Sequence, residues 1–118
     1  MDCNLKTIFW NVRGLNSGAK RTAVRSVISA AAPTIVCLQE TKLAHVSDTI
    51  VLDTLGPSFE DYFFLPADGT RGGILLAWQC STISLFNPLI GEHHVTTLVS
   101  SLADEGHWWL TGVYWAQD

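Results

Sequence analysis

The hydrophobic pattern at the start of the chain alternates between strand-like and helix-like segments. Lys6–Val12 is rich in β-branched and aromatic residues and stops at Arg13-Gly14, which is typical of a buried strand. Ala19–Ala31 repeats its apolar residues at helical spacing and is closed by Pro33. Thr34–Leu38 is a short continuous apolar run, as expected of a strand buried on both faces. This order predicts a βαβ unit whose two strands are parallel neighbours.

Beyond this unit, the pattern changes to short strands separated by turn residues. A second helix is predicted from Ser47, as its N-cap, to Gly56 at its end. Strands are then predicted at Tyr62–Leu65, Gly73–Trp78, Thr82–Phe86, His94–Leu102 and Trp108–Tyr114. The turns between them are predicted at Asp68-Gly69, Asn87-Pro88, Gly91 and Asp104-Glu105-Gly106. The short links favour antiparallel hairpins, so the predicted fold class is α/β with a mixed sheet.

Composition supports a single folded unit and limits how that unit meets a ligand. The 118 residues are 47% hydrophobic and 15% charged, which is enough for one domain over residues 1–118 with a sizeable core. The net charge of −4 argues against a protein that holds nucleic acid mainly by a basic surface. It does not exclude a nuclease, because a metal site needs acidic ligands and a local basic patch still meets phosphates. Four of the seven cationic residues fall in one stretch, which is either a solvated helix face or such a patch: Arg13, Lys20, Arg21 and Arg25.

Cysteine usage and the start of the chain indicate the compartment. The three cysteines, Cys3, Cys37 and Cys80, form no C-x-x-C pair and are odd in number, which argues against a disulfide framework or a zinc site. The first residues lack the pattern of a secretory signal, and no apolar run approaches the roughly 20 residues of a membrane span. We therefore expect an intracellular, reducing location and no membrane partner.

The loop Gly14–Lys20 lies between a strand and a helix, where a phosphate-binding P-loop would be found. Its spacing differs from that motif, because three residues separate the two glycines and Ala19 stands between Gly18 and Lys20. We interpret the loop as a turn, and nucleotide binding through it is the weaker alternative.

Two polar residues follow the two parallel strands. Asn11 and Glu40 come at the carboxyl ends of neighbouring strands, where open α/β sheets place their ligands. A carboxylate there binds a hard cation through oxygen, or is simply a charged residue that ends a strand. An amide there orients a nucleophile or phosphate, or only caps a turn. Position alone leaves both alternatives open for each residue.

The residues around this pair resemble a known signature. Trp10-Asn11-Val12-Arg13-Gly14-Leu15 and Leu38-Gln39-Glu40-Thr41-Lys42 are similar to the opening motifs of the endonuclease/exonuclease/phosphatase superfamily. The form with Arg-Gly-Leu and then Gln-Glu-Thr-Lys is most similar to endonuclease domains of plant LINE-type non-LTR retrotransposons. Weaker matches are Arg71-Gly72-Gly73-Ile74 and Thr111-Gly112-Val113-Tyr114, so the resemblance spans Lys6 to Tyr114.

The resemblance implies a fold, a reaction and roles for three residues. The fold is a four-layered α/β/β/α sandwich, of which this chain would form the N-terminal, mixed-sheet part. The reaction is Mg²⁺-dependent hydrolysis of phosphodiesters in DNA, by in-line attack of water. Glu40 would be the Mg²⁺ ligand, Asn11 would position the catalytic groups, and Tyr114 would contact the substrate phosphate. The resemblance also implies DNA and the C-terminal half of the domain as partners, and the nucleus as the place of action.

The chain also departs from the family pattern. It contains no Gly-Asp-Phe-Asn segment and no terminal Asp-His pair, and we interpret His93, His94 and His107 as structural. We therefore expect a truncated domain that does not cleave DNA alone, with the inner face of its first sheet exposed. The alternative is a non-catalytic phosphate- or nucleotide-binding α/β module. An interaction protein that uses exposed strands and tryptophans is a third class.

Overall fold

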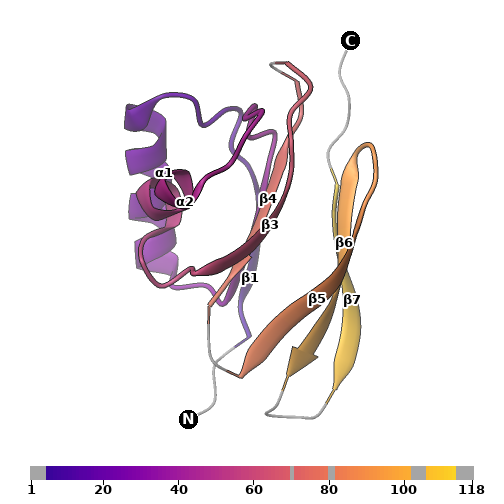
Figure 1. Ribbon diagram of the computed structural model, residues 1–118. Coiled ribbons are helices and arrows are strands. Elements are labelled where there is room, and N and C mark those ends of the chain that lie inside the picture. The colour runs from indigo at the N-terminus through magenta and orange to yellow at the C-terminus, as the bar shows by residue number, and fades with distance from the viewer. Residues whose placement is uncertain (1–4, 70, 80–81, 102–105, 114–118) are drawn as a thin grey trace.

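Three layers make up the fold, and their order follows from which strands are buried on both faces. The computed structural model describes residues 5–69, 71–79, 82–101 and 106–113. A four-stranded sheet of order β1-β2-β4-β3 lies between two helices and a three-stranded sheet of order β5-β6-β7 (Figure 1). The elements are β1 (Thr7–Asn11), α1 (Gly18–Ala31), β2 (Ile35–Gln39), α2 (Asp48–Leu55), β3 (Asp61–Leu65), β4 (Ile74–Trp78), β5 (Ile83–Ile90), β6 (His94–Ser101) and β7 (His107–Val113).

The first sheet is mixed, as the sequence predicted. β1 and β2 pair in parallel with Asn11 opposite Gln39, whereas β4 is antiparallel to both β2 and β3. The parallel pair is joined through α1, which confirms the βαβ unit. Because β1 and β2 run in the same direction, Asn11 and the residue after Gln39 meet at one edge of the sheet.

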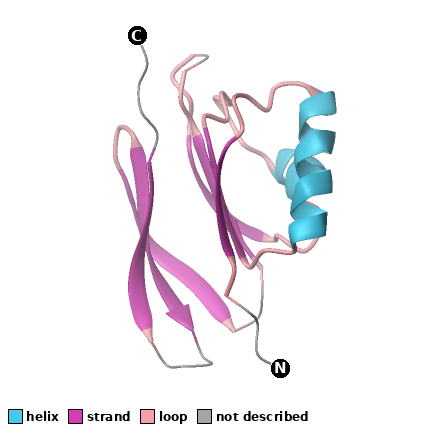
Figure 2. Cartoon of the chain, turned by 180° about the vertical axis from the view of Figure 1, so that it is seen from behind, coloured by secondary structure: helices cyan, strands magenta, loops and turns pink. Residues whose placement is uncertain are grey.

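Both helices lie on the same face of the first sheet, and both begin at a serine cap (Figure 2). The Ser17 side chain accepts a hydrogen bond from the Lys20 amide at 3.1 Å, and Ser47 does the same for Ile50 at 3.3 Å. Each bond satisfies one of the amides that a first helical turn leaves without a partner. The second cap confirms the predicted start of α2.

The alternation of residues along β2 divides the interior into two cores. Val36 and Leu38 point into the core beneath the helices, while Ile35 and Cys37 point toward the second sheet. All four are at most 1% exposed. A strand whose two faces are both covered has no polar positions, and this explains the apolar run that predicted β2. The residues of β4 alternate between the same two cores.

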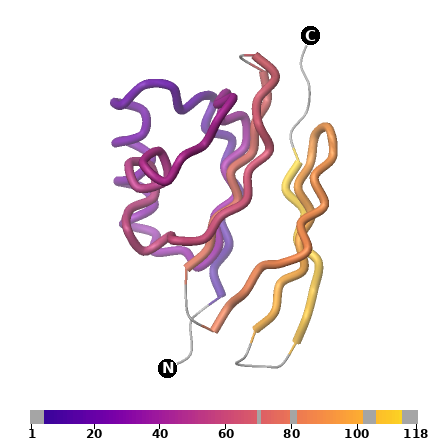
Figure 3. Tube along the Cα trace, in the orientation of Figure 1, coloured from indigo at the N-terminus to yellow at the C-terminus, as the bar shows by residue number. Residues whose placement is uncertain are grey.

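The expectation that the inner face of the first sheet would be exposed is wrong. After β4 the chain crosses to a separate layer, and Ile83, Leu85, Val95 and Val99 of β5 and β6 pack on that face. Figure 3 shows the orange and yellow part of the chain, from β5 to β7, as this second layer beside the first sheet. Short antiparallel hairpins have the same pattern within one sheet or in two, so the sequence did not reveal the crossing.

The predicted turn at Asn87-Pro88 is also wrong. β5 continues through it to Ile90, and the pairing with β6 shifts register between Phe86 and Leu89. Asn87 takes the left-handed backbone conformation with φ 53°, which is the geometry of a bulge rather than of a chain reversal. The true turn lies at Gly91, where the amide donates to the His94 carbonyl at 2.9 Å.

The outer face of the second sheet carries a row of apolar residues. Phe86, Leu98 and Trp109 lie opposite one another in a row across β5, β6 and β7, and Trp109 is 59% exposed. Trp78 is buried in contrast, and Trp108 packs against the core between the sheets. The tryptophans in the described ranges therefore divide between packing and surface positions.

The two sheets pack closely where Gly112 of β7 faces Cys37 of β2. A methyl group built on Gly112 would overlap the Cys37 Sγ, and it would lie 3.9 Å from the Cys37 Cβ. Burial in this interface raises the pKa of the Cys37 thiol to about 12, which keeps it protonated. Cys37 is therefore a small buried hydrophobe, as its sequence environment indicated.

We predict that Gly112→Ala lowers the free energy of unfolding by about 1–3 kcal/mol, because the added methyl group forces the sheets apart. In a Cys37→Ala background the same substitution is expected to cost much less, since only the sulfur atom obstructs it. Urea unfolding of the two single variants and the double variant measures this coupling. Additive costs would show that the two residues do not share the space described.

Candidate active site

The edge at the carboxyl ends of β1 and β2 holds the two residues that the sequence placed there. The Asn11 Nδ2 donates to the Glu40 Oε2, so the amide and the carboxylate are in direct contact. The Asn11 Oδ1 accepts from the Arg13 amide at 3.1 Å, which fixes the orientation of the whole side chain. The structure therefore brings Asn11 and Glu40 together. It also leaves the Glu40 Oε1 without a hydrogen bond from the described residues.

Backbone hydrogen bonds fix the segment after β2 between two other segments. On one side, the loop after β1 continues the parallel pairing of β1 with β2. On the other side, the residues just before β4 continue its antiparallel pairing with β2. The bonds on the β1 side are Val12 N to Gln39 O at 3.0 Å, Gly14 N to Glu40 O at 2.8 Å and Leu15 N to Thr41 O at 2.8 Å. On the β4 side, Thr41 N donates to Gly73 O at 3.2 Å and Lys42 N to Gly72 O at 2.8 Å. Glu40 thus stands on a backbone that is held from both sides.

Left-handed backbone is concentrated at this edge. Arg13, Glu40 and Lys42 have φ values of 57°, 53° and 59°, and they are three of the five non-glycine residues with positive φ in the described ranges. Such a conformation costs roughly 1–2 kcal/mol for a residue that has a Cβ atom. Residues in sparsely populated conformations gather at functional sites, where the surrounding contacts enforce them.

Gly73 shows how little space surrounds this loop. Its φ is +95°, and an added methyl group would overlap the Thr41 Oγ1 and lie 3.3 Å from the Lys42 amide nitrogen. Thr41 itself is completely buried. The Gly-Gly motif that the sequence predicted as a strand start is therefore the close contact that shapes the loop after Glu40.

The second sheet reaches the same edge through Gln39. The Gln39 Nε2 donates to the Val113 carbonyl at the end of β7 over 2.7 Å. Tyr114, the third predicted site residue, lies outside the described residues. Gln39 belongs to the motif Leu38–Lys42, but the sequence alone predicted no role for it. Its position two residues after Cys37 on a strand of alternating faces was the available signal, because it places Gln39 on the side of the second sheet.

The histidines do not join Glu40 in a cluster. In the part of the chain that the structure describes, no three His, Cys, Asp or Glu side chains are close enough to hold a metal ion together. His107 is exposed, with its ring edge toward Phe86 at 6.5 Å between centroids, and the His94 ring lies against Gly91. These positions agree with the structural interpretation of His94 and His107.

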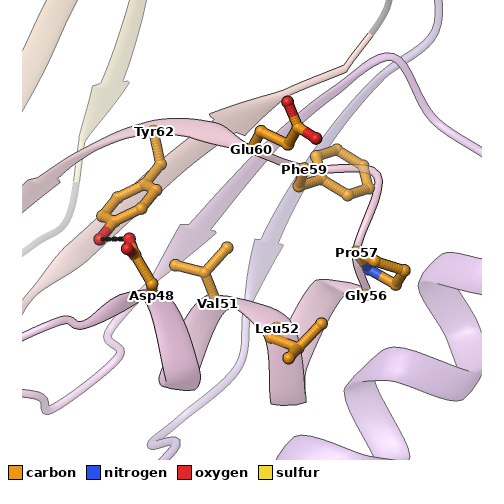
Figure 4. Close-up of a pocket in the computed structure, with 8 residues that line it drawn as sticks. All are labelled: Asp48, Val51, Leu52, Gly56, Pro57, Phe59, Glu60 and Tyr62. Atoms are coloured by element: carbon orange, nitrogen blue, oxygen red, sulfur yellow. Dashed lines mark hydrogen bonds between the residues drawn. The ribbon is translucent and has the colours of Figure 1, made fainter.

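A pocket lies away from this edge, between α2 and the start of β3. It measures about 320 Å³ and has an apolar floor that includes Val51 and Phe59 (Figure 4). At its rim the Tyr62 hydroxyl donates to the Asp48 Oδ1 at 2.8 Å, and this bond is the main cause that raises the Tyr62 pKa. The start of β3 pairs with the end of β4, so this pocket is at the opposite end of the sheet from Glu40.

Comparison with known proteins identifies the class and then the family. The chain shares its fold with solved structures that match more than nine-tenths of its length, one of them an AP endonuclease. It also matches the model of the Endonuclease/Exonuclease/phosphatase family over residues 8–113. The chain therefore belongs to this family, and both its mixed sheet and its second sheet are parts of that fold.

Three solved structures are similar to this chain. The AP endonuclease LMAP from Leishmania major is 28% identical with a TM-score of 0.62, and the match covers 93% of this chain and 40% of that one. TDP2 from D. rerio, complexed with a single-strand DNA product, is 20% identical with a TM-score of 0.61 over 91% and 44% of the two chains. The APE2 catalytic domain from Xenopus laevis is 17% identical with a TM-score of 0.59 over 93% and 45%. The chain thus spans less than half the length of these structures.

The residues at the edge fit one part of a Mg²⁺ site. Members of this family typically depend on Mg²⁺. Mg²⁺ takes oxygen ligands, keeps several waters and is often bound by only one or two carboxylates. The half-buried Glu40 carboxylate, with the Asn11 amide on one oxygen and the other oxygen open, fits one such ligand. The described residues supply no second carboxylate beside it.

Neither helix in the described ranges has the length and apolar character to cross a membrane.

We predict that Gln39→Leu frees the end of β7 from the Glu40 edge. The lost bond is expected to lower the free energy of unfolding by about 1 kcal/mol and to speed amide hydrogen exchange in β7. Gln79→Leu is the matched control, because the Gln79 Nε2 also donates to a carbonyl, Pro33 O at 2.7 Å, but within the first layer. Equal β7 exchange in the two variants would contradict the role of Gln39.

Proposed function

We propose that this chain is the N-terminal part of a Mg²⁺-dependent phosphodiesterase domain that acts on DNA as an endonuclease. The observation that carries the proposal is the contact between Asn11 and Glu40 at the carboxyl ends of two parallel strands. The family supports it, because the pair stands where this fold receives ligands. A membrane has no role in the proposal, and the nucleus is its proposed place of action.

The chemistry that we assign to the pair is limited to binding and orientation. The open oxygen of Glu40 is the proposed Mg²⁺ ligand, and Asn11 holds the other oxygen so that the carboxylate keeps one direction. A bound cation would supply positive charge to the scissile phosphate and to the leaving oxygen. Tyr114 directly follows Val113, whose carbonyl is tied to Gln39, and we propose that it contacts the substrate phosphate.

We further propose that the chain derives from a non-LTR retrotransposon of the plant LINE type. The support is the sequence itself: Arg13-Gly14-Leu15 after Asn11, and Thr41-Lys42 after Glu40, are the forms that such endonuclease domains carry. DNA as the substrate has separate support, because the similar structures include an AP endonuclease and a TDP2 complex with a DNA product.

The third part of the proposal is that these residues do not cleave DNA without the rest of the domain. One carboxylate with one amide leaves most of the coordination of Mg²⁺ to water, and no histidine of the described ranges joins it. Removing members of a catalytic unit commonly abolishes most of its rate enhancement. We propose the remaining half of the domain as the partner that completes the site.

We predict that the 118-residue chain with Mg²⁺ does not nick supercoiled plasmid DNA above the level of its Glu40→Ala variant. The measurement is conversion of supercoiled to open-circular plasmid, with EDTA as the blank. Nicking that depends on both Mg²⁺ and Glu40 would show that the chain is active alone.

We also predict that the genomic DNA after the codon for Asp118 encodes, in the same frame, Gly-Asp-Phe-Asn, a terminal Asp-His pair and then reverse-transcriptase motifs. The longer product is expected to nick plasmid with Mg²⁺, and Glu40→Ala to slow it by about 10²-fold or more. Glu60→Ala is the matched control, because Glu60 is an exposed carboxylate that lines the distant pocket.

A different intact domain in that frame would overturn the retrotransposon origin. A longer product with both motifs that neither nicks DNA nor depends on Glu40 would overturn the endonuclease function. Nucleotide binding by such an inactive product would favour a phosphate-binding module instead.

A further inference from the structure

Some of the cationic side chains bond to other parts of the protein and others do not. Two that make no such bond belong to the loops around Asn11 and Glu40. Of the seven Lys and Arg residues, Lys6 donates from Nζ to the Ala31 carbonyl at 2.8 Å. Arg21 donates to the Leu15 carbonyl at 2.7 Å and lies 3.7 Å from the Asp53 carboxylate. In the described ranges, neither the Arg13 nor the Lys42 side chain makes a hydrogen bond or an ion pair.

The backbones of Arg13 and Lys42 are fixed although their side chains are free. The Arg13 amide donates to Asn11, the residue that holds Glu40. The Lys42 amide donates to the Gly72 carbonyl at 2.8 Å, and the Lys42 carbonyl accepts from the Asn16 side chain at 2.9 Å. Both cations therefore project from anchored positions within three residues of the Asn11 and Glu40 pair.

The two loops that carry these cations are in contact. A methyl group on Gly14 would lie 3.4 Å from the Lys42 Cδ, so the aliphatic stem of Lys42 passes over the residue next to Arg13. The nearby turn between β3 and β4 carries one acidic and one basic residue, Asp68 and Arg71. Within the two segments that carry the pair, residues 11–15 and 38–42, two cations stand against the one carboxylate of Glu40, in a chain whose net charge is −4.

The left-handed backbone at both positions is unusual for residues with long side chains. Arg13 and Lys42 have φ values of 57° and 59°, where glycine or asparagine is the favourable residue. Among the described residues, neither side chain makes an ion pair or a hydrogen bond that would offset this strain. A multiply charged anion outside the folded chain is the ligand that two such cations match.

We propose that Arg13 and Lys42 form a phosphate-binding pair that holds the backbone of a nucleic-acid strand across Glu40. The pair deepens the proposed function, on which it rests, by giving the substrate class: a strand with successive phosphates rather than a small molecule with one. A small phosphate ester engages the metal ligand alone, whereas a strand that passes over Glu40 also presents its neighbouring phosphates to both loops. Each contact releases condensed counterions, so it appears in the salt dependence of binding.

The test uses the 118-residue chain in EDTA, with a fluorescein-labelled duplex oligonucleotide and anisotropy as the readout. The Kd is measured between about 25 and 200 mM KCl, where each neutralised phosphate contributes roughly 0.9 to the slope of log K against log salt. Arg13→Gly with Lys42→Gly is expected to reduce the magnitude of that slope by about 1.8 and to weaken binding at low salt at least tenfold.

Glycine is chosen because it accepts the left-handed conformation, so the double variant keeps the fold. Its thermal melting temperature is expected to equal or exceed that of the parent chain. Arg13→Lys with Lys42→Arg keeps both charges and is expected to keep the slope. Arg25→Gln is the control on the helical side. Arg25 is an exposed residue of α1 near Gly56, and its side chain makes no hydrogen bond or ion pair with the described residues.

Three results would overturn the phosphate-binding pair: no salt-dependent binding by the parent chain, an unchanged slope in the folded glycine variant, or an equal loss in Arg25→Gln. Competition by inorganic phosphate at concentrations equal to those of the oligonucleotide phosphates would also overturn it, because it would show a site for single phosphates. The measurement contains no metal and no cleavage step. A negative binding result would therefore reject the phosphate-binding pair without rejecting the endonuclease function. The endonuclease function is tested separately, by plasmid nicking with the longer product.

Discussion

Burial of β2 on both of its faces is the constraint on which the rest of this structure depends. Ile35 and Cys37 belong to one core, and Val36 and Leu38 belong to the other, so a single five-residue strand joins all three layers. Because that strand is completely enclosed, its only contact with solvent is at its carboxyl end. A charged residue is tolerated there and nowhere else along the strand. Glu40 is consequently left partly exposed by the same packing that buries its neighbours.

The same constraint explains which parts of the fold the sequence predicted. The apolar run of β2 and the helical spacing of α1 are local patterns that predict one structure, the βαβ unit. The parallel strands of that unit bring Asn11 and Glu40 together. The division of later strands between two sheets is not local. β4 and β5 are both short strands near turn residues, and only the packing of Ile83 and Leu85 on the first sheet shows that a new layer begins.

The meeting of Asn11 and Glu40 was predicted from the sequence, but the backbone conformation around them was not. Asn11 and Glu40 stand out in the sequence because polar side chains follow buried strands. The left-handed conformations of Arg13 and Lys42 cannot be predicted from the sequence in this way. No local propensity favours them, and the surrounding hydrogen bonds enforce them. The bulge at Asn87 was missed for a related reason. Asn-Pro is a turn signal in an isolated sequence, but here the pairing of β5 with β6 overrides it.

Cys37 gives this architecture an internal reporter. Its sulfur is shielded by both layers and its thiol stays protonated at any pH at which the protein is handled, so reagents that need a thiolate cannot attack it in the closed structure. Labelling of Cys37 requires the sheets to separate at Gly112, and its rate therefore counts those openings. The atom that leaves no room for a side chain at position 112 also records how often the two layers part.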